Sequence, residues 1–131
     1  MPYEVVQPPK DDEELKVKGY ELIKLSADLG RAVDIEGFVQ SWLGGVRVII
    51  ERDDNNTPTG IVYLALGRRW LFQDTTASIL YINVKDTEKT LDFIKTLCNA
   101  MGADVLYMQD EEPISETPKE KAYKVREIRL R

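Results

Sequence analysis

The stretch KDTEKT, residues 85–90, lies where an apolar segment ends and a helical pattern begins. The N–H groups of a helix's first turn can bind an anion, and many α/β proteins hold a phosphate at such a junction. Close approach of a phosphate favours glycine, but neither this stretch nor the helical pattern after it contains one. Asp86 or Thr87 can instead cap the helix, and Glu88 adds a carboxylate at the helix's positive end. We therefore expect this junction to hold its own capping carboxylate and no phosphate.

The residue types limit other catalytic chemistries. The chain has no histidine and one cysteine, Cys98. A Ser-His-Asp or Cys-His relay, and a zinc site built from histidines or several cysteines, are therefore excluded within it. Cys98 shares a helical face with apolar residues, which predicts a core position and no nucleophilic role. Tyr107 and Tyr123 are candidate general acids, but without a cofactor loop we expect them to be half-buried packing residues. We predict no catalytic residue.

Four carboxylates, Glu51, Asp53, Asp54 and Asp74, are candidates for a carboxylate site, but nothing in their spacing brings them together. The oxygen-bearing side chains at 53–56 lack the alternation and the closing glutamate of an EF-hand calcium loop. We therefore predict no metal site and a plain turn at 53–56.

Arg68, Arg69, Trp70 and Phe72 combine cations with aromatic rings, a combination that can bind single-stranded nucleic acid. The formal charge of the chain is 18 − 23 = −5, which opposes attraction to nucleic acid or to an anionic membrane. That charge is also too mild for an inhibitor that mimics nucleic acid. We expect a tight connection between strands, with Trp70 and Phe72 packed on the core. Arg68, Arg69 and Trp70 remain candidates for contact with a partner.

The segment 119–131 is basic, with three lysines and three arginines against two glutamates. Lys124, Arg126 and Arg129 are candidates for contact with an acidic partner. Charged side chains can also protect an edge strand from aggregation. The two roles are compatible, and we favour the protective one.

Periodicity predicts a single α+β domain over residues 11–131, preceded by an extended arm over residues 1–10 that carries three prolines. The expected helices cover 19–31, a segment capped by Asp34 and ended by Gly44 and Gly45, and 86–101; the expected strands cover 46–52, 60–67, 76–84, 104–109 and 122–131, with a polar, structure-breaking segment at 110–121. No apolar run matches a signal peptide or a membrane span, so we expect a soluble protein.

The segment SILYINVKDTEKTLDFIKTLCNAMGADVLYMQ resembles the central unit of the GNAT-type N-acetyltransferases. The likeness lies in the strand that closes with Val84, the helix that closes with Ala100, Met101 and Gly102, and the strand 105–108. It implies a GNAT-like fold: a mixed, mostly antiparallel sheet with two N-terminal helices and one crossover helix. In that family an Arg/Gln-x-x-Gly-x-Gly/Ala loop follows the strand and holds the acetyl-CoA pyrophosphate.

This chain lacks the glycines of that loop. We therefore expect a non-catalytic, degenerate GNAT-like domain without a cofactor, which acts through protein–protein contacts or self-assembly. Its resemblance to small acetyltransferase-like domains met in bacteriophages suggests a phage structural or accessory protein, located in the virion or in the cytoplasm of the producing cell. The alternative is an N-acetyltransferase with an atypical phosphate loop, in which Val84, Lys85 and Lys89 would hold acetyl-CoA. We expect no nucleic-acid partner.

Overall fold

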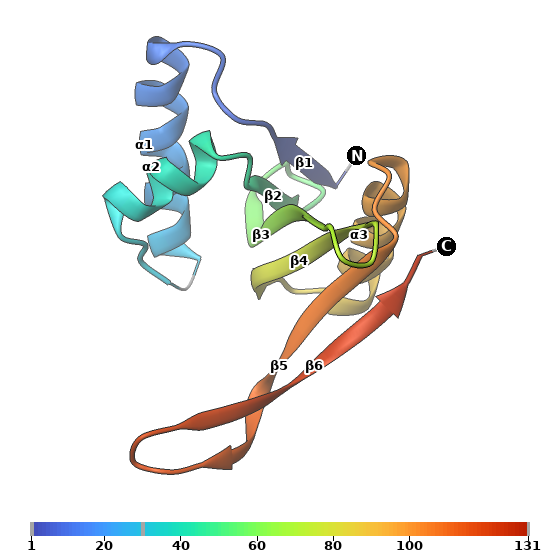
Figure 1. The fold of residues 1–131 in the computed structure, drawn as a ribbon. Helices are drawn as coiled ribbons and strands as arrows, with labels where there is room; N and C mark the ends of the chain where they lie inside the picture. The colour runs from blue at the N-terminus through green and yellow to red at the C-terminus, as the bar shows by residue number, and fades with distance from the viewer. Residues whose placement is uncertain (1, 30, 131) are drawn as a thin grey trace.

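The computed structural model describes residues 2–29 and 31–130, and for residues 110–113 the backbone only. Within these residues the chain forms three α-helices and one six-stranded sheet (Figure 1). The elements are β1 (Tyr3–Val6), α1 (Asp12–Asp28), α2 (Ile35–Leu43), β2 (Arg47–Arg52), β3 (Pro58–Arg69), β4 (Asp74–Asn83), α3 (Thr87–Ala100), β5 (Val105–Glu116) and β6 (Lys121–Arg129). None of the helices in the described chain combines the length and the apolar character needed to cross a membrane.

The strands lie in the sheet in the order in which they occur in the sequence, from β1 to β6. Neighbouring strands are antiparallel except for β4 and β5, which run parallel. Helix α3 connects these two strands, as the sequence predicts. The fold is therefore the expected α+β arrangement with a mixed, mostly antiparallel sheet.

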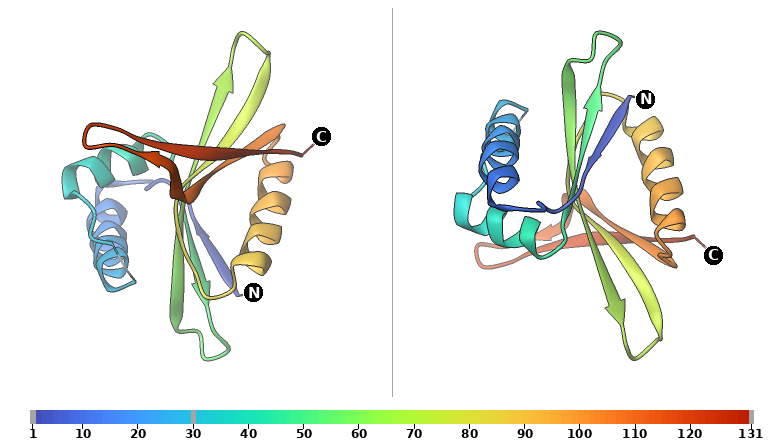
Figure 2. Two further views of the ribbon diagram at one scale, coloured as in Figure 1. Left: turned by 90° about the horizontal axis from the view of Figure 1, so that it is seen from below. Right: turned by 90° about the horizontal axis from the view of Figure 1, so that it is seen from above.

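The helices cover opposite faces of the sheet, with α1 and α2 on one face and α3 on the other (Figure 2). Each face has its own apolar core. The core under α3 includes Ile49, Val62, Leu64, Ala77, Ile94, Cys98 and Leu106. The core under α1 and α2 includes Val6, Leu22, Phe38, Trp42, Val48, Ile50 and Ile61.

An aspartate caps each helix at its start. The Asp34 carboxylate accepts a hydrogen bond from Gly37 N at 2.8 Å, and the Asp86 carboxylate accepts one from Lys89 N at 3.0 Å. Both caps confirm the sequence prediction. The first helix begins at Asp12, capped by Asp11, and not at residue 19. Its acidic first turn belongs to the helix, because negative charge there stabilises the exposed N–H groups.

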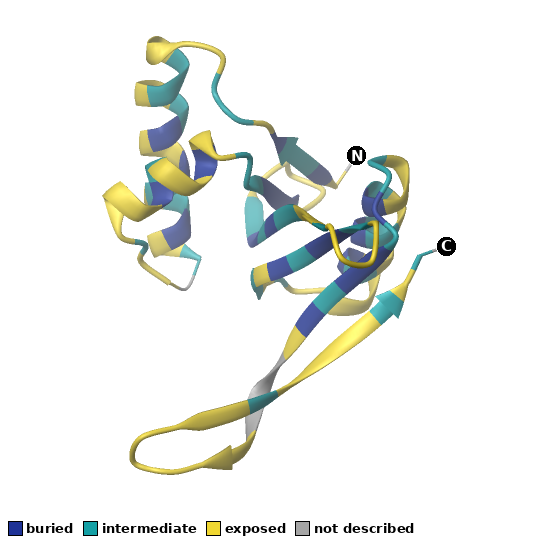
Figure 3. Cartoon of the chain, in the orientation of Figure 1, coloured by how far each residue is buried: buried dark blue, intermediate teal, exposed yellow. Residues whose placement is uncertain are grey.

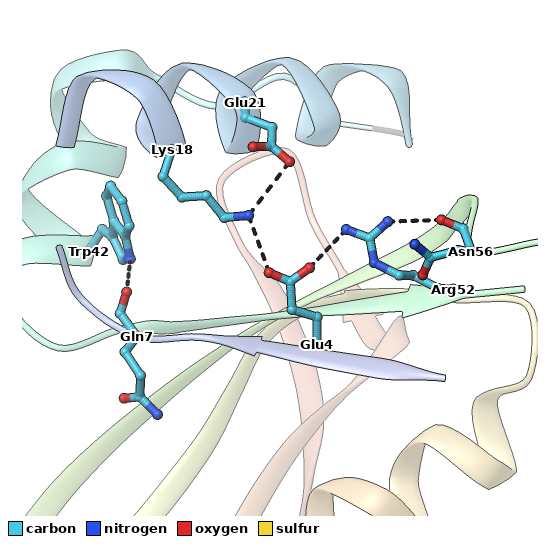
Figure 4. A network of polar contacts seen from close by, with 7 residues as sticks. All are labelled: Glu4, Gln7, Lys18, Glu21, Trp42, Arg52 and Asn56. Carbon is cyan, nitrogen blue, oxygen red and sulfur yellow. Dashed lines mark hydrogen bonds and ion pairs between the residues drawn. The ribbon is translucent and has the colours of Figure 1, made fainter. Parts of the chain in front are cut away.

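The expected N-terminal arm is part of the sheet, because its residues form the edge strand β1 beside β2. The Glu4 carboxylate accepts hydrogen bonds from Lys18 of α1 at 3.2 Å and from Arg52 of β2 at 2.8 Å (Figure 4). The indole N–H of Trp42 donates to the carbonyl of Gln7 at 2.9 Å. In the sequence, the prolines on either side of β1 conceal this short strand. In the structure, contacts to β2 and to the helices α1 and α2 hold it in place.

The C-terminal part forms a long hairpin where the sequence predicts a polar loop at 110–121. Strands β5 and β6 pair across a turn in which Glu120 N donates to the Thr117 hydroxyl at 3.0 Å. Register shifts on both sides of Pro113 accommodate the proline within β5. The hairpin extends away from the body, and its described outer part is exposed (Figures 1 and 3).

Candidate functional site

The start of α3 is occupied by the carboxylate of Glu51, which lies on β2 and is 6% exposed. The Glu51 side chain accepts hydrogen bonds from Lys85 N at 3.0 Å and from Asp86 N at 3.2 Å. These two N–H groups belong to the connection between β4 and α3, the junction at which a phosphate was considered. A carboxylate of the protein's own chain therefore takes the position of an anion there.

Two hydroxyls complete the coordination of this carboxylate. Thr59 donates to Glu51 Oε1 at 2.7 Å, and Thr90 lies 3.4 Å from Glu51 Oε2. The hydroxyl of Tyr3 lies 2.9 Å from that of Thr90 and links β1 to the group. We call these residues the Glu51 cluster: Tyr3, Glu51, Thr59, Lys85, Asp86 and Thr90.

The hydrogen bonds decide the charge state of Glu51. Burial of the carboxylate pushes its pKa upward, but the donors of the Glu51 cluster together outweigh burial. The pKa of Glu51 therefore lies below its ordinary value, and the side chain is ionised at neutral pH. A second anion at the start of α3 would meet this negative charge a few ångströms away.

Gly60 allows the Glu51 side chain to reach the start of α3. Glu51 is paired with Gly60 on β3, the strand that separates β2 from β4. A Cβ atom at position 60 would lie 2.7 Å from Val84 Cα and 2.8 Å from the carbonyl oxygen of Asn83. The missing side chain lets the connection after β4 cross close above β3, within reach of Glu51.

The residues that would hold acetyl-CoA in the alternative function make contacts within the protein itself. Val84 is half-buried and packs against the core under α3. The backbone N–H of Lys85 donates to Glu51, and that of Lys89 donates to Asp86. Sequence reasoning found the Asp86 cap, because such a cap depends on neighbouring residues. It named Glu51 only among four dispersed carboxylates and missed its contact with the start of α3; the signal was a glutamate directly after the apolar run Val48–Ile50.

An open cleft of about 580 Å³ lies beside β4. It is lined from β4 by Ile79, Leu80 and Tyr81 and from β5 by Met108 and Gln109, together with residues of β6. We call it the strand cleft. It lies where β4 and β5 separate, because their pairing ends at the Ile79–Met108 pair.

A second cavity of about 390 Å³ lies on the α2 face of the sheet. Phe38 and Trp42 of α2 line it together with Tyr63 of β3, and we call it the α2 pocket. Leu80, Tyr81 and Arg31 line both this pocket and the strand cleft. The two cavities therefore adjoin at one point of β4.

Both candidate tyrosines line the strand cleft and are half-buried, as expected. Tyr107 accepts a hydrogen bond from Arg69 and faces its guanidinium at 5.5 Å. These contacts give Tyr107 a structural role beside the connection between β3 and β4.

The connection between β3 and β4 is an exposed tip, and the prediction that its aromatic side chains pack on the core is wrong. Trp70, Leu71 and Phe72 are 72%, 87% and 65% exposed. Arg68 stacks on Trp70 at 4.8 Å, and Arg69 stacks on Phe72 at 4.9 Å. The hairpin extends beyond the helices, so no core is available beneath its tip (Figure 2). We call residues 68–73 the hairpin tip.

The hairpin tip is internally ordered. The Gln73 side-chain amide donates to the carbonyl of Trp70 at 2.8 Å, and Phe72 N donates to the carbonyl of Arg69 at 3.1 Å. Arg69 also pairs with Asp74 through two hydrogen bonds, and this guanidinium holds the pKa of Asp74 below its usual range. Hydrogen bonds and stacking contacts therefore order the tip around Leu71, whose own side chain is exposed.

The basic residues proposed on the last strand lie on β6, at the open edge of the sheet. Lys124, Arg126 and Arg129 are all exposed, and Arg129 pairs with Glu127 at 3.2 Å. Their place on an edge strand agrees with the protective role, because charge there opposes edge-to-edge pairing.

The remaining candidates do not converge. Asp53 accepts hydrogen bonds from Asn55 N and Thr57 N, both at 2.9 Å, and forms the plain turn that the sequence predicts. Asp74 is held by Arg69. Cys98 is buried, and burial raises the pKa of its thiol to about 11. Among the described residues, no group of three or more His, Cys, Asp or Glu side chains is placed to hold a metal ion.

Comparison with known proteins gives one consistent likeness. No protein-family model matches the chain, and no curated protein matches its sequence. Among solved structures, it resembles a ribosomal-protein-alanine N-acetyltransferase from Brucella melitensis biovar Abortus 2308, with a TM-score of 0.60 and 12% identity over 91% of this chain and 84% of that one.

Two further solved structures agree with this likeness. A GNAT family acetyltransferase from Staphylococcus aureus subsp. aureus USA300_TCH1516 has a TM-score of 0.56 and 11% identity over 89% of this chain and 95% of that one. A putative acetyltransferase from Salmonella typhimurium, solved with acetyl-CoA, has a TM-score of 0.55 and 13% identity over 98% and 94%. The chain therefore has a GNAT-like fold, and at these identities the likeness extends to the fold alone.

Proposed function

We propose that this protein is a GNAT-fold binding protein that acts through protein–protein contacts and does not use acetyl-CoA. The observation that carries the proposal is the Glu51 carboxylate, which accepts hydrogen bonds from the N–H groups of Lys85 and Asp86. A pyrophosphate at the start of α3 would have to displace a hydrogen-bonded carboxylate from its donors. A structural or accessory role in a bacteriophage, the most concrete form of this proposal, rests on the sequence resemblance.

The hairpin tip supports a contact with another protein. Exposed tryptophan and arginine side chains are enriched among the residues that contribute most binding energy at protein interfaces. The stacking of Arg68 on Trp70 and of Arg69 on Phe72 restricts these rings before binding, which lowers the side-chain entropy lost on contact. Trp70, Leu71 and Phe72 would be the side chains inserted into an apolar depression of the partner.

Calorimetric titration with acetyl-CoA tests the first half of the proposal. The wild-type protein is expected to show no binding at millimolar cofactor. The Glu51→Ala variant, which frees the two N–H groups, is expected to bind measurably more tightly than the wild type if the carboxylate is the obstacle. Micromolar binding by the wild type that is lost in a Lys85→Ala, Lys89→Ala variant would refute the proposal.

Site-specific photo-crosslinking in cells that naturally produce the protein tests the second half. A crosslinking residue in place of Leu71, at the hairpin tip, is expected to give a discrete adduct that disappears in a Trp70→Ala, Phe72→Ala background. The matched control carries the crosslinking residue in place of Val17, which is 66% exposed on α1. Equal adducts from both positions, or adducts insensitive to the loss of the rings, would contradict a specific contact.

The second candidate function is N-acetyl transfer with an atypical phosphate loop. The strand cleft favours it, because a cavity of about 580 Å³ is large enough for a small-molecule ligand. The acetyl-CoA titration separates the two candidates, since a transferase must bind its cofactor.

A further inference from the structure

The strand cleft lies between two strand edges that have no strand beside them. In β4, Tyr81, Ile82 and Asn83 pair with β3 on one side, whereas the register with β5 ends at Ile79. In β5, Gln109 pairs with Val125 of β6 on its other side. Each edge therefore carries backbone N–H and C=O groups that face the cleft without a neighbouring strand, the arrangement to which an extended chain can add.

The two faces of an added strand would meet different surroundings. Side chains of a strand alternate between the faces of the sheet. On one face the adjoining α2 pocket offers aromatic side chains, Phe38, Trp42 and Tyr63. On the other face lie Ile82 and Met108, which belong to or pack against the core under α3. A large apolar side chain on the first face would fill the α2 pocket.

One cation lies where the cleft and the pocket adjoin. Arg31 lines both cavities and is exposed. None of the ion pairs among the described side chains includes Arg31. The nearby carboxylate of Asp34, which also lines the α2 pocket, accepts a hydrogen bond from Gly37 N as the cap of α2. Arg31 is therefore a cation available to a carboxylate of the ligand.

We propose that the strand cleft binds an extended peptide segment of a partner protein, which adds as a strand to β4. The segment carries a large apolar side chain for the α2 pocket and a carboxylate for Arg31. Main-chain hydrogen bonds to the unpaired edge of β4 beyond Ile79 supply affinity, and the pocket and the cation supply specificity. The carboxylate comes from an acidic side chain or from the carboxyl terminus of the peptide.

This inference rests on the proposed function, because a cleft that binds acetyl-CoA is not free for a peptide. It adds a second contact surface, since the hairpin tip and the strand cleft consist of different residues. The tip inserts into a partner, whereas the cleft receives a segment of one.

A phage-displayed library of random dodecapeptides provides the probe. The library is selected on the full-length wild-type protein and counter-selected on Leu80→Asp, because Leu80 is 59% exposed and lines both cavities. Synthetic versions of the enriched peptides are expected to bind the wild type and to lose about tenfold or more in affinity for Leu80→Asp. Leu71→Asp, the same change at an 87% exposed position on the hairpin tip, is expected to bind them unchanged.

Two modifications of the peptides test the binding mode. Methylation of backbone nitrogens, one at a time, is expected to weaken binding by about tenfold at alternate positions, because each removes one main-chain hydrogen bond. Arg31→Ala is expected to weaken binding of the free peptide acid. If amidation of the carboxyl terminus has the same effect, the carboxylate is the terminal one; if it has none, an acidic side chain supplies it.

Three results would overturn the inference. They are a library without enrichment over the counter-selection, a binding peptide that tolerates methylation at every nitrogen, and equal losses in Leu80→Asp and Leu71→Asp. Acetyl-CoA titrated into the same wild-type sample separates the two proposals. Micromolar cofactor binding without any peptide binding would refute both, whereas absence of both ligands would refute the peptide site alone.

Discussion

Glu51 illustrates how a single charged side chain can fill a binding position. Its carboxylate is nearly inaccessible and takes four hydrogen bonds within the Glu51 cluster, two from backbone N–H groups and two from hydroxyls. A buried carboxylate without such donors would be expected to take up a proton. The same donors therefore keep Glu51 charged and hold the connection between β4 and α3 in place.

We expect the stability contributed by Glu51 to depend on pH. Because its folded-state pKa lies below the ordinary value of 4.5, its stabilising effect is present above about pH 4.5 and is lost as the pH falls through the folded-state pKa. At pH 7, Glu51→Gln is expected to lower the free energy of unfolding by about 1–3 kcal/mol, since hydrogen bonds to a charged group are replaced by weaker ones. Urea unfolding between pH 3 and pH 7 measures the difference from the wild type.

The control for this titration is Glu88→Gln, in the first turn of α3, where the side chain is exposed. Its effect is expected to stay within about 0.5 kcal/mol. A difference between the wild type and Glu51→Gln that stays constant from pH 3 to pH 7 would show that the charge of Glu51 does not contribute.

Among the elements, the three-residue connection between β4 and α3 is the one that supplies the backbone donors to Glu51. It is short enough for Asp86 to cap the helix and for the Lys85 and Asp86 N–H groups to face Glu51. Its position depends on Gly60 of β3, above which Val84 passes. The site is therefore formed by β2, β3, α3 and the connection acting together.

Gly60→Ala is expected to destabilise the protein by about 1–3 kcal/mol, because the new methyl group would overlap Val84 and force the connection outward. Hydrogen exchange of the Lys85 and Asp86 amides should become faster as they leave Glu51. Gly67→Ala is the matched control on the same strand, since its Cβ would lie 3.6 Å from Thr76 Oγ1, an ordinary contact. Equal unfolding free energies for the two variants would contradict the proposed role of Gly60.

For the whole molecule, the sequence predicts the layers better than the contacts between them. The helical stripe that ends in Trp42 and the caps at Asp34 and Asp86 are local patterns, and the structure confirms them. The bond from Lys85 N to Glu51 spans 34 positions and depends on strand register and on Gly60, so no local pattern reports it. β1 was missed because its four residues lie between prolines, and its pairing with β2 depends on a strand more than 40 residues away.

The hairpin tip was interpreted wrongly for a related reason. Apolar residues are usually buried, but burial requires a second layer, and β3 and β4 extend past the helices that supply one. Whether the apolar residues of the hairpin tip are buried depends on the lengths of the strands relative to the helices. Such lengths are the least certain part of a sequence-based prediction.

The order of the strands has a consequence for how the chain folds during synthesis. Strands that follow one another in the sequence are neighbours in the sheet, so the sheet can grow at one edge as the polypeptide leaves the ribosome. No strand has to be inserted between two that are already paired. Two pairings must wait for helices: that of β1 with β2 until α1 and α2 have been made, and that of β4 with β5 until α3 has been made. Each new strand therefore becomes the exposed edge of the growing sheet. The last one, β6, stays at the edge, and its basic residues protect it.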